Sequence, residues 1–296
     1  MPSTLTLYTP AGVLAKAAPL RLAARRLKAM GYAVTVDESA TARHQRFAGT
    51  DEVRLAAIHR VAQAAPSIAL ATRGGYGMSR LLDSIDWPLL ARAVEQGTRW
   101  VGYSDLTPLN LGLLAHTGAG SWAGTLGVDD FGQETVDEVT AACFDEAMSG
   151  ELEAVGFRTE PGFDGLDLRG RLWGGNLTMV CALLGTRHWP RVKGGILFLE
   201  DVNEHPYRVE RNLLHLLQAG VIDAQRAVVL GQFSGWKPAP LDRGYTLKSA
   251  VSALRSRTAT PVLTGLPLGH VATHVTLPVG RRAQLLVQGR DVLIGW

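Results

Sequence analysis

The stretch Ser67–Gly77, SIALATRGGYG, decides the fold of the first half of the chain. Its first part, Ser67–Thr72, is a short apolar run with the length of a buried β-strand. Three glycines follow in Arg73–Gly77, and a helical pattern begins near Ser79. A buried strand that passes through glycines into a helix is typical of a βα unit, and glycines at such a turn let the backbone approach a ligand closely.

The same alternation of strand and helix patterns continues on both sides of this stretch. Strands are expected at residues 5–10, 32–36, 67–72 and 100–103. Helices are expected at residues 14–30, 52–64, 79–85, 87–96, 109–116 and 135–148. Because parallel strands need crossover connections and helices supply them, the pattern predicts an α/β domain with a mostly parallel sheet over residues 1–156.

The pattern changes at residues 157–170, FRTEPGFDGLDLRG, which are glycine-rich and show little periodicity. We expect a linker there, followed by a C-terminal domain over residues 171–296. That part mixes strands at 172–173, 195–200, 227–230, 261–264, 284–287 and 292–294 with helices at 177–184, 207–217 and 247–256. The last two strands are joined by a hairpin-like turn, so the domain is expected to hold a mixed sheet.

Composition excludes several classes of protein. The 296 residues are 46% hydrophobic and 19% charged, which is too apolar for a disordered chain, and two cysteines make no disulfide framework. We find neither a signal-peptide pattern nor a run approaching 18 apolar residues, so we expect a cytoplasmic protein with no membrane partner. The net charge is only +3, and the cationic run Arg21–Lys28 fits a solvated helix face. Nucleic acid is therefore not an expected partner.

Two loops at predicted strand ends have the residue types that acyl-transfer chemistry needs. The loop Arg73–Gly77 is either an anion-binding loop or a plain tight turn, and it matches neither a Walker A nor a dinucleotide motif. Gly102–Asp105, GYSD, follows an apolar strand and precedes a helix start at Thr107-Pro108. Ser104 on such a turn is presented as a nucleophile would be, although Ser104 or Asp105 is alternatively a helix N-cap.

Two further loops supply a carboxylate and a histidine. Glu200 and Asp201 end the apolar strand GILFLE, where they would orient a histidine, bind a metal or cap a helix. A metal is disfavoured because no His or Cys stands at ligand spacing nearby. His270 follows a strand in the Pro/Gly-shaped loop LPLGH, and His274 competes with it for the same role.

Together these loops supply the three groups of a serine hydrolase. Ser104 needs a base to remove its proton, and His270 needs a carboxylate such as Glu200 to fix its tautomer. The order Ser, acid, His also occurs in α/β-hydrolases. With the serine in one predicted domain and Glu200 and His270 in the other, the site is expected at the cleft between the domains.

Five ordered blocks, spread over nearly the whole chain, resemble the LD-carboxypeptidase family. They are ATRGGYGMSRLLDSIDW (71–87), WVGYSDLTPLNLGL (100–113), WGGNLTMVCALLGT (173–186), ILFLEDVNEHPYRVERNLLHLLQAG (196–220) and GLPLGHVATHVTLPVG (265–280). The family includes muropeptide LD-carboxypeptidases and the related microcin C immunity peptidases.

The resemblance implies a serine peptidase with Ser104 as nucleophile, His270 as general base and Glu200 as its carboxylate. The backbone N–H groups of Asp105 and Gly75 would form the oxyanion hole. The family combines an N-terminal flavodoxin-like domain with a C-terminal domain holding a barrel-like sheet. It needs no metal or other cofactor, and its members often form homodimers. Its muropeptidases cleave the bond before a terminal D-amino acid in cell-wall recycling, so the expected substrate is a small peptide or muropeptide.

Four residues are candidates for contact with the substrate. Arg73 would either grip a carboxylate or pair with an acid of the other domain. Trp173 stands where a smaller aliphatic residue is expected, and it would either stack on a substrate ring or pack between the domains. Tyr76 and Asn176 are further substrate-binding candidates. The first loop, Tyr8–Gly12, departs from the Ala-Pro-Ser type of many members, so no serine of that loop is assigned a role.

Other functions remain open at this level. An immunity peptidase that cleaves a peptidyl- or aminoacyl-nucleotide is the alternative within the class. A non-catalytic protein that binds a small ligand between two domains is the alternative from another class. A nicotinamide oxidoreductase is the weakest option, because no dinucleotide fingerprint follows the first strand.

Overall fold

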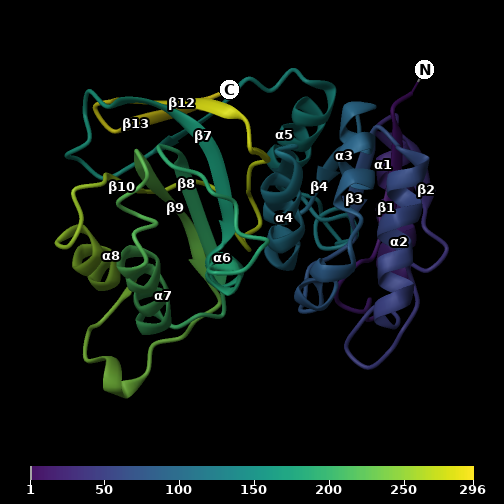
Figure 1. Ribbon diagram of the computed structural model, residues 1–296, viewed down its shortest axis with the longest axis horizontal. Helices are drawn as coiled ribbons and strands as arrows, with labels where there is room; N and C mark the ends of the chain where they lie inside the picture. The colour runs from purple at the N-terminus through teal and green to yellow at the C-terminus, as the bar shows by residue number, and fades with distance from the viewer. Residues whose placement is uncertain (1) are drawn as a thin grey trace. The chain divides into compact units, whose positions relative to one another are not determined.

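The computed structural model describes residues 2–296, and they divide into two compact units (Figure 1). Unit 1 consists of residues 2–151, Thr186–Pro190 and Val275–Val279. Unit 2 consists of Leu152–Gly185, Arg191–His274 and Gly280–Trp296. The chain thus returns to unit 1 twice after it has entered unit 2.

Unit 1 is built on a six-stranded sheet in the order β11-β5-β4-β3-β1-β2. Its strands are β1 (Thr4–Tyr8), β2 (Ala33–Val36), β3 (Ile68–Ala71), β4 (Arg99–Val101), β5 (Ser121–Ala123) and β11 (Leu277–Val279). The first five are parallel, and β11 pairs antiparallel with β5. The order 2-1-3-4-5 is that of flavodoxin, so the fold expected for the first half is confirmed.

Each helix of unit 1 follows one of these strands along the chain, as the alternation predicted. They are α1 (Ala18–Ala29), α2 (Asp51–Ala64), α3 (Trp87–Glu95), α4 (Thr107–Thr117) and α5 (Glu138–Ser149). Helices α2, α3 and α4 pack side by side (Figure 1). Each residue of β3 is buried, which is why its sequence is an unbroken apolar run.

Two predicted helices of this half differ from what the pattern indicated. The helix expected from residue 14 begins at Ala18, because Pro19 occupies the first turn. The helix expected at 79–85 is a pair of 3₁₀ turns, η1 (Met78–Arg80) and η2 (Leu82–Ser84). It cannot continue into α3, because Ile85 is extended and Asp86 caps the new helix by accepting the N–H of Leu89.

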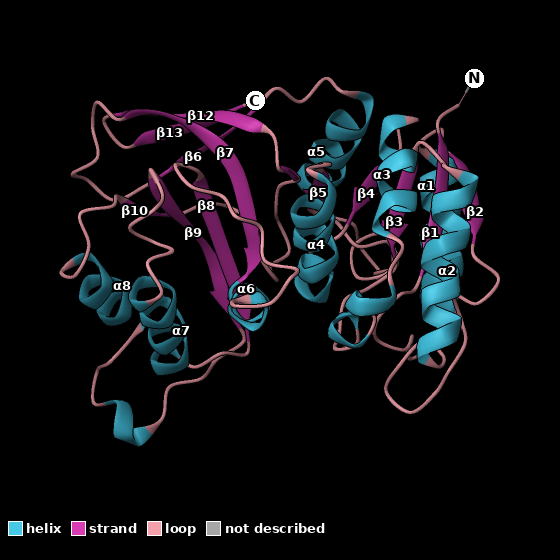
Figure 2. Ribbon diagram, in the orientation of Figure 1, coloured by secondary structure: helices cyan, strands magenta, loops and turns pink. Residues whose placement is uncertain are grey.

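Unit 2 contains a mixed seven-stranded sheet that curls into a half-barrel (Figure 2). The strand order is β10-β9-β8-β7-β12-β13-β6. The strands are β6 (Ala154–Arg158), β7 (Asp167–Asn176), β8 (Ile196–Val202), β9 (Ala227–Ser234), β10 (Val262–Thr264), β12 (Arg282–Gln288) and β13 (Asp291–Gly295). Strands β7 to β10 pair in parallel, whereas β7, β12, β13 and β6 pair antiparallel. The predicted mixed sheet and its C-terminal hairpin are therefore confirmed.

The stretch 157–170, for which the composition predicted a linker, lies within unit 2. It contains the end of β6 and the start of β7, which pair with β13 and β12. Along the start of β7 the side chains alternate between exposed and partly buried. One face of an antiparallel strand meets water, so its sequence keeps polar residues and glycines that are also typical of a loop.

Three helices and one 3₁₀ turn complete unit 2. They are α6 (Leu177–Leu183), α7 (Pro206–Gln218), α8 (Leu247–Arg255) and η4 (Pro240–Asp242). Helix α7 packs against both α6 and α8 (Figure 2). Its buried side, Val209, Leu213 and Leu216, follows the i, i+4, i+7 spacing of an amphipathic helix.

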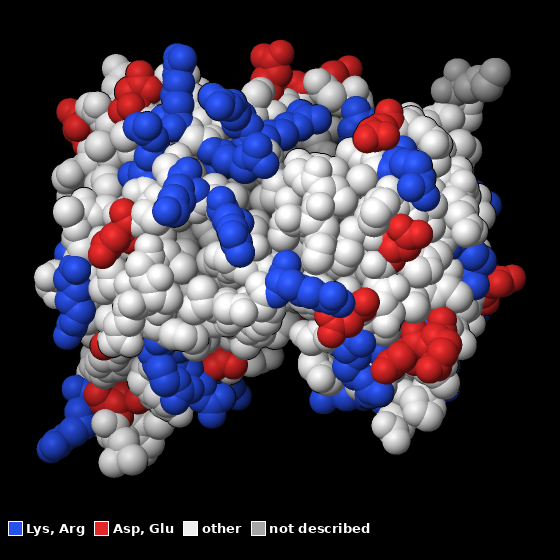
Figure 3. All heavy atoms as spheres, in the orientation of Figure 1, with Lys and Arg blue, Asp and Glu red and all other residues white. Residues whose placement is uncertain are grey.

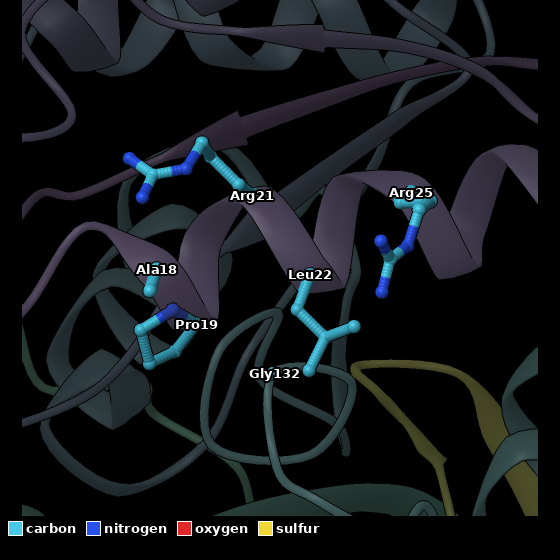
Figure 4. A pocket seen from close by; sticks show the side chains of 6 residues that line it. All are labelled: Ala18, Pro19, Arg21, Leu22, Arg25 and Gly132. Carbon is cyan, nitrogen blue, oxygen red and sulfur yellow. The ribbon is translucent and has the colours of Figure 1, made fainter.

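Charged side chains are unevenly spread over the face in Figure 3, where Lys and Arg gather over β7 and β12. The strand register sets exposed Arg171 directly opposite exposed Arg282. On α1, Arg21 and Arg25 are exposed beside a surface depression of about 400 Å³ (Figure 4). This exposure supports a solvated helix face. Within residues 2–296 no helix combines the length and the apolarity needed to span a membrane.

Candidate active site

Ser104 lies on a strained turn between β4 and α4. Its φ is +62°, a left-handed conformation that costs energy for any residue other than glycine. The surrounding backbone holds the turn: the N–H of Gly102 donates to the carbonyl of Trp122, and Asn110 Nδ2 donates to the carbonyl of Gly102 at 2.9 Å. Ser104 is half-buried, and a serine on such a turn has the position that the nucleophile takes in other α/β folds.

The alternative interpretation of this turn as a helix cap is wrong. Helix α4 has Leu106 at its N-cap position, with no side-chain hydrogen bond there. Neither Ser104 nor Asp105 occupies that position. The strain at Ser104 therefore does not serve helix capping, and strained positions of this kind cluster at functional sites.

The glycine loop Arg73–Gly77 lies against the nucleophile turn. A Cβ on Gly74 would lie 2.8 Å from Ser104 Oγ and 3.4 Å from the backbone N of Asp105, so only glycine fits. The next residue, Gly75, has φ +80°, which favours glycine for a conformational reason. The carbonyl of Gly74 accepts the N–H of Gly12 at 3.1 Å, which connects this loop to the loop after β1. The loop backbone at Gly74 is thus packed against Ser104.

Asp105 faces the glycine loop with a buried carboxylate. Its Oδ2 accepts the backbone N–H of Met78 at 2.9 Å, and the side chain is 5% exposed. Burial raises the pKa of Asp105 to about 6, although the Met78 and Gly77 amides and the charges of Arg54 and Arg46 act to lower it.

Unit 2 brings Glu200 and His270 together. Glu200 is fully buried on β8, and its Oε2 lies 2.9 Å from His270 Nδ1. The loop after β10 places the histidine: a Cβ on Gly269 would lie 2.8 Å from the carbonyl of Gln232, and the His270 carbonyl accepts Ser234 Oγ at 2.8 Å. A carboxylate on Nδ1 fixes the orientation and tautomer of the imidazole, which is how a general base is held in a serine hydrolase.

Burial of the Glu200 carboxylate raises its pKa, and the bond to His270 acts in the opposite direction. The second carboxylate oxygen, Oε1, lies 3.2 Å from Asn176 Nδ2. Both oxygens of this buried acid therefore have donors. Such pairing compensates in part the cost of removing a carboxylate from water.

His274, the competing histidine, lies elsewhere in the same loop. Its side chain is 1% exposed, and its Nδ1 lies 3.0 Å from the carbonyl of Val271. His274 thus braces its own loop, and His270 is the histidine that contacts Glu200.

Asn176, a predicted substrate-binding residue, has a structural environment of its own. It caps α6 by accepting the N–H of Met179, and its Nδ2 also donates to Asp201 Oδ1 at 2.8 Å. Asp201 in turn accepts from the backbone N–H and hydroxyl of Thr178. These bonds favour a role in holding Glu200.

The other three predicted contact residues differ in their accessibility. Trp173 is fully buried, and its indole N–H donates to Gln225 Oε1 at 3.0 Å. This burial favours packing over stacking on a substrate. Tyr76 is 45% exposed beside Phe47. Arg73 is half-buried, and its Nη1 donates to the carbonyl of Val13 at 2.9 Å. Within residues 2–296 it forms no ion pair with a carboxylate.

Two residues of this region were not found from the sequence. Arg54 on α2 is fully buried and donates to the carbonyls of Pro10 and Gly77, both at 2.9 Å. Asn110 on α4 holds Gly102. An arginine in a helical pattern is usually exposed, so nothing in the local sequence indicates this burial. Over the described residues, no group of three or more His, Cys, Asp or Glu is arranged to hold a metal ion.

Comparison with known proteins agrees with this fold. Residues 5–124 match the family model described as LD-carboxypeptidase N-terminal domain, and residues 169–285 match the LD-carboxypeptidase C-terminal domain. A chain with both of these domains belongs to a class of peptidases. The chain belongs to the LD-carboxypeptidase family and is a carboxypeptidase.

Individual relatives match over almost the full chain. A muramoyltetrapeptide carboxypeptidase from Oxalobacter formigenes, solved by crystallography, is 39% identical with a TM-score of 0.90, covering 99% of this chain and 98% of that one. A probable murein peptide carboxypeptidase from Bacillus subtilis is 28% identical, covering 99% of this chain and 93% of the relative. The microcin C7 self-immunity protein MccF, in complex with aspartyl sulfamoyl adenosine, shares the fold at 20% identity and TM-score 0.86, over 99% and 96% of the two chains.

Proposed function

We propose that the chain is a serine-type LD-carboxypeptidase that removes a terminal D-amino acid from a murein peptide through an acyl-enzyme on Ser104. The observation that carries the proposal is the left-handed turn at Ser104 with the glycine loop packed against its Oγ. The relatives named as murein peptide and muramoyltetrapeptide carboxypeptidases support the substrate class.

In the proposed mechanism His270 removes the proton from Ser104 Oγ as that oxygen attacks the scissile carbonyl. Glu200 stabilises the imidazolium that forms, because its carboxylate is already 2.9 Å from Nδ1. His270 then gives the proton to the departing amine of the D-amino acid. In the second half-reaction it activates a water molecule that hydrolyses the ester and regenerates Ser104.

The negative charge of each tetrahedral intermediate needs donors close to Ser104. We assign this role to the backbone N–H groups of Asp105 and Gly75. Support comes from Gly74, whose lack of a side chain lets the loop backbone approach Ser104 Oγ. Loss of one such donor costs roughly 100- to 1000-fold in kcat in other serine hydrolases.

A carboxypeptidase must also recognise the free carboxylate of its substrate, and we assign this role to Arg73. Its guanidinium is in the glycine loop and has no carboxylate partner among residues 2–296. Its Nε is buried and has no hydrogen-bond partner in the described part of the chain. Guanidinium groups bind carboxylates with two hydrogen bonds. The exposed ring of Tyr76 is placed to contact the same substrate.

The test is a product screen with a murein tetrapeptide and an aminoacyl sulfamoyl adenosine as the two substrates. We expect release of the terminal D-amino acid from the tetrapeptide and no turnover of the nucleotide. Ser104→Ala and His270→Ala should each lower kcat by roughly 10⁴-fold. Ser252→Ala, on the exposed side of α8, is the matched control and should retain full activity. Normal turnover by Ser104→Ala would refute the mechanism, and hydrolysis of the nucleotide alone would refute the substrate assignment.

A further inference from the structure

The peptide bond between Gly77 and Met78 lies between two buried charges of opposite sign. Arg54 Nη1 donates to the carbonyl oxygen of Gly77 at 2.9 Å. Asp105 Oδ2 accepts the N–H of Met78 at 2.9 Å. These are the two polar atoms of a single peptide group, so one cation and one anion fix its plane from both sides. Hydrogen bonds to charged groups are stronger than those between neutral groups.

Arg54 is itself held rigidly. It is fully buried, its Nη1 also donates to the carbonyl of Pro10, and its Nη2 pairs with Asp51 on the same helix. Its guanidinium carbon lies 4.8 Å from the centre of the Phe47 ring. A Cβ on Gly77 would lie 2.7 Å from Nη1, so the glycine is needed for this close approach. The arginine therefore anchors the glycine loop to α2.

Asp105 is the residue that follows the nucleophile. The charged groups that act on it are Arg54 on α2 and Arg46 in the preceding loop, and the N–H groups of Gly77 and Met78 face it from the glycine loop. Burial works against the ionised form of this carboxyl. An apolar side chain at position 105 would avoid that cost. Helix capping does not account for the aspartate either, because the N-cap of α4 is Leu106. The bond from Asp105 to the loop is thus its evident role.

The opposite end of the same loop is the part that approaches Ser104. Gly74 packs on Ser104 Oγ, whereas Gly77 and Met78 are held by the two charges. With three glycines in five residues the loop has few side chains to anchor it, and glycine backbones are conformationally free. Catalytic donors must nevertheless be held within fractions of an ångström. External support at Gly77–Met78 supplies that rigidity.

We propose that Arg54 and Asp105 are positioning residues that clamp the Gly77–Met78 peptide and thereby hold the glycine loop against Ser104. The two side chains act through the loop backbone and do not touch the substrate, whereas the backbone N–H of Asp105 has the separate oxyanion role proposed above. The inference rests on the proposed role of Ser104 as the nucleophile, and it adds a requirement for a buried cationic and a buried anionic side chain besides those of Ser104, Glu200 and His270.

The first test is Asp105→Asn in the full chain, assayed for kcat and KM on a murein tetrapeptide. Asparagine keeps the size but removes the charge and one acceptor. We expect kcat to fall roughly 10- to 100-fold, and the upper end of this range approaches the effect of losing one oxyanion donor. KM should change less than about three-fold. The ratio of wild-type to variant kcat should decrease as the pH falls through about 6, because wild-type Asp105 is then protonated. Effects of pH that are common to both proteins cancel in the ratio.

Two more variants make the outcome decisive. Asp37→Asn is the matched control, because Asp37 is a buried aspartate of unit 1 whose carboxylate bonds to Arg60 and Ser39. Its kcat should stay at the wild-type value. Arg54→Lys keeps the cation but loses the fork that reaches two carbonyls, so it should also lower kcat, and it provides the test if Asp105→Asn does not fold.

Wild-type kcat in Asp105→Asn or in a folded Arg54→Lys, together with inactive Ser104→Ala, would overturn the clamp and leave the proposed function standing. A kcat ratio independent of pH would overturn it as well. Activity in Ser104→Ala would instead refute the proposed function. The two failures are therefore distinguishable.

Discussion

The buried carboxyl of Asp105 should give the stability of the protein a pH dependence that Asp105→Asn removes. Burial raises its pKa from 3.8 to about 6 in the folded protein. Between these values the folded chain binds a proton that the unfolded chain has lost, so the free energy of unfolding falls as the pH rises. At 1.36 kcal/mol for each pKa unit, ionised Asp105 lowers the stability by about 3 kcal/mol above pH 7, and this cost disappears below about pH 4.

The measurement is urea unfolding of wild type and Asp105→Asn at intervals from pH 4.5 to 7.5, with each transition fitted separately. The asparagine does not titrate. As the pH rises through this range, the free energy of unfolding of the variant should therefore increase by about 2 kcal/mol relative to that of wild type. The lost acceptor adds only a constant difference between the two proteins. For Asp37 burial raises the pKa, but bonds to Arg60 and Ser39 leave it below the usual value. The difference between Asp37→Asn and wild type should therefore stay flat above pH 4.5. A flat difference for Asp105→Asn too would refute the account of its burial.

Three further predictions concern the site and the sheet. Glu200→Gln should lower kcat by roughly 10⁴-fold, measured on a murein tetrapeptide, because a neutral amide favours the wrong tautomer of His270; near-normal turnover would contradict the triad. Gly74→Ala should lower kcat while circular dichroism shows an intact fold, because its methyl group would lie 2.8 Å from Ser104 Oγ. Gly156→Ala is the control and should be fully active, because the nearest neighbour of its Cβ would lie at 3.8 Å. Arg171→Gln should raise the Tm at low ionic strength, because it removes one of two like charges that face each other across β7 and β12. The effect should disappear in about 1 M salt, where the Debye length is only about 3 Å. A Tm difference that does not depend on salt would argue against repulsion.

The alternation of strands and helices in unit 1 could be predicted because each element has a local signal. β3 is buried on both faces and so has a continuous apolar sequence. β5 and β11 were missed, since each has only three residues and shows no period. β11 is paired with β5 only because the chain returns from unit 2, which no local pattern records.

The positions of the candidate residues at or near strand ends were predicted for a similar reason. Glu200 lies near the end of β8 and His270 follows β10, and parallel strands bring such positions to one edge of their sheet, whereas Ser104 follows β4 in the sheet of unit 1. The resemblance to the family selected His270 over His274, and the coordinates supply the physical ground, because His270 contacts Glu200 whereas His274 Nδ1 lies against the carbonyl of Val271. The burial of Trp173 likewise depends on strands distant in sequence.

By itself the sequence determined the order of the elements, the parallel architecture and the loops in which chemistry is expected. These follow from periodicity and glycine placement, which act between neighbours in the chain. The tertiary structure alone decided that the two ends of stretch 157–170 belong to a sheet and that Arg54 and Asp105 meet at one peptide bond. The physical reason is that burial and long-range hydrogen bonds depend on which segments pack together, and a residue such as Arg54 has the same local pattern whether it faces water or the interior.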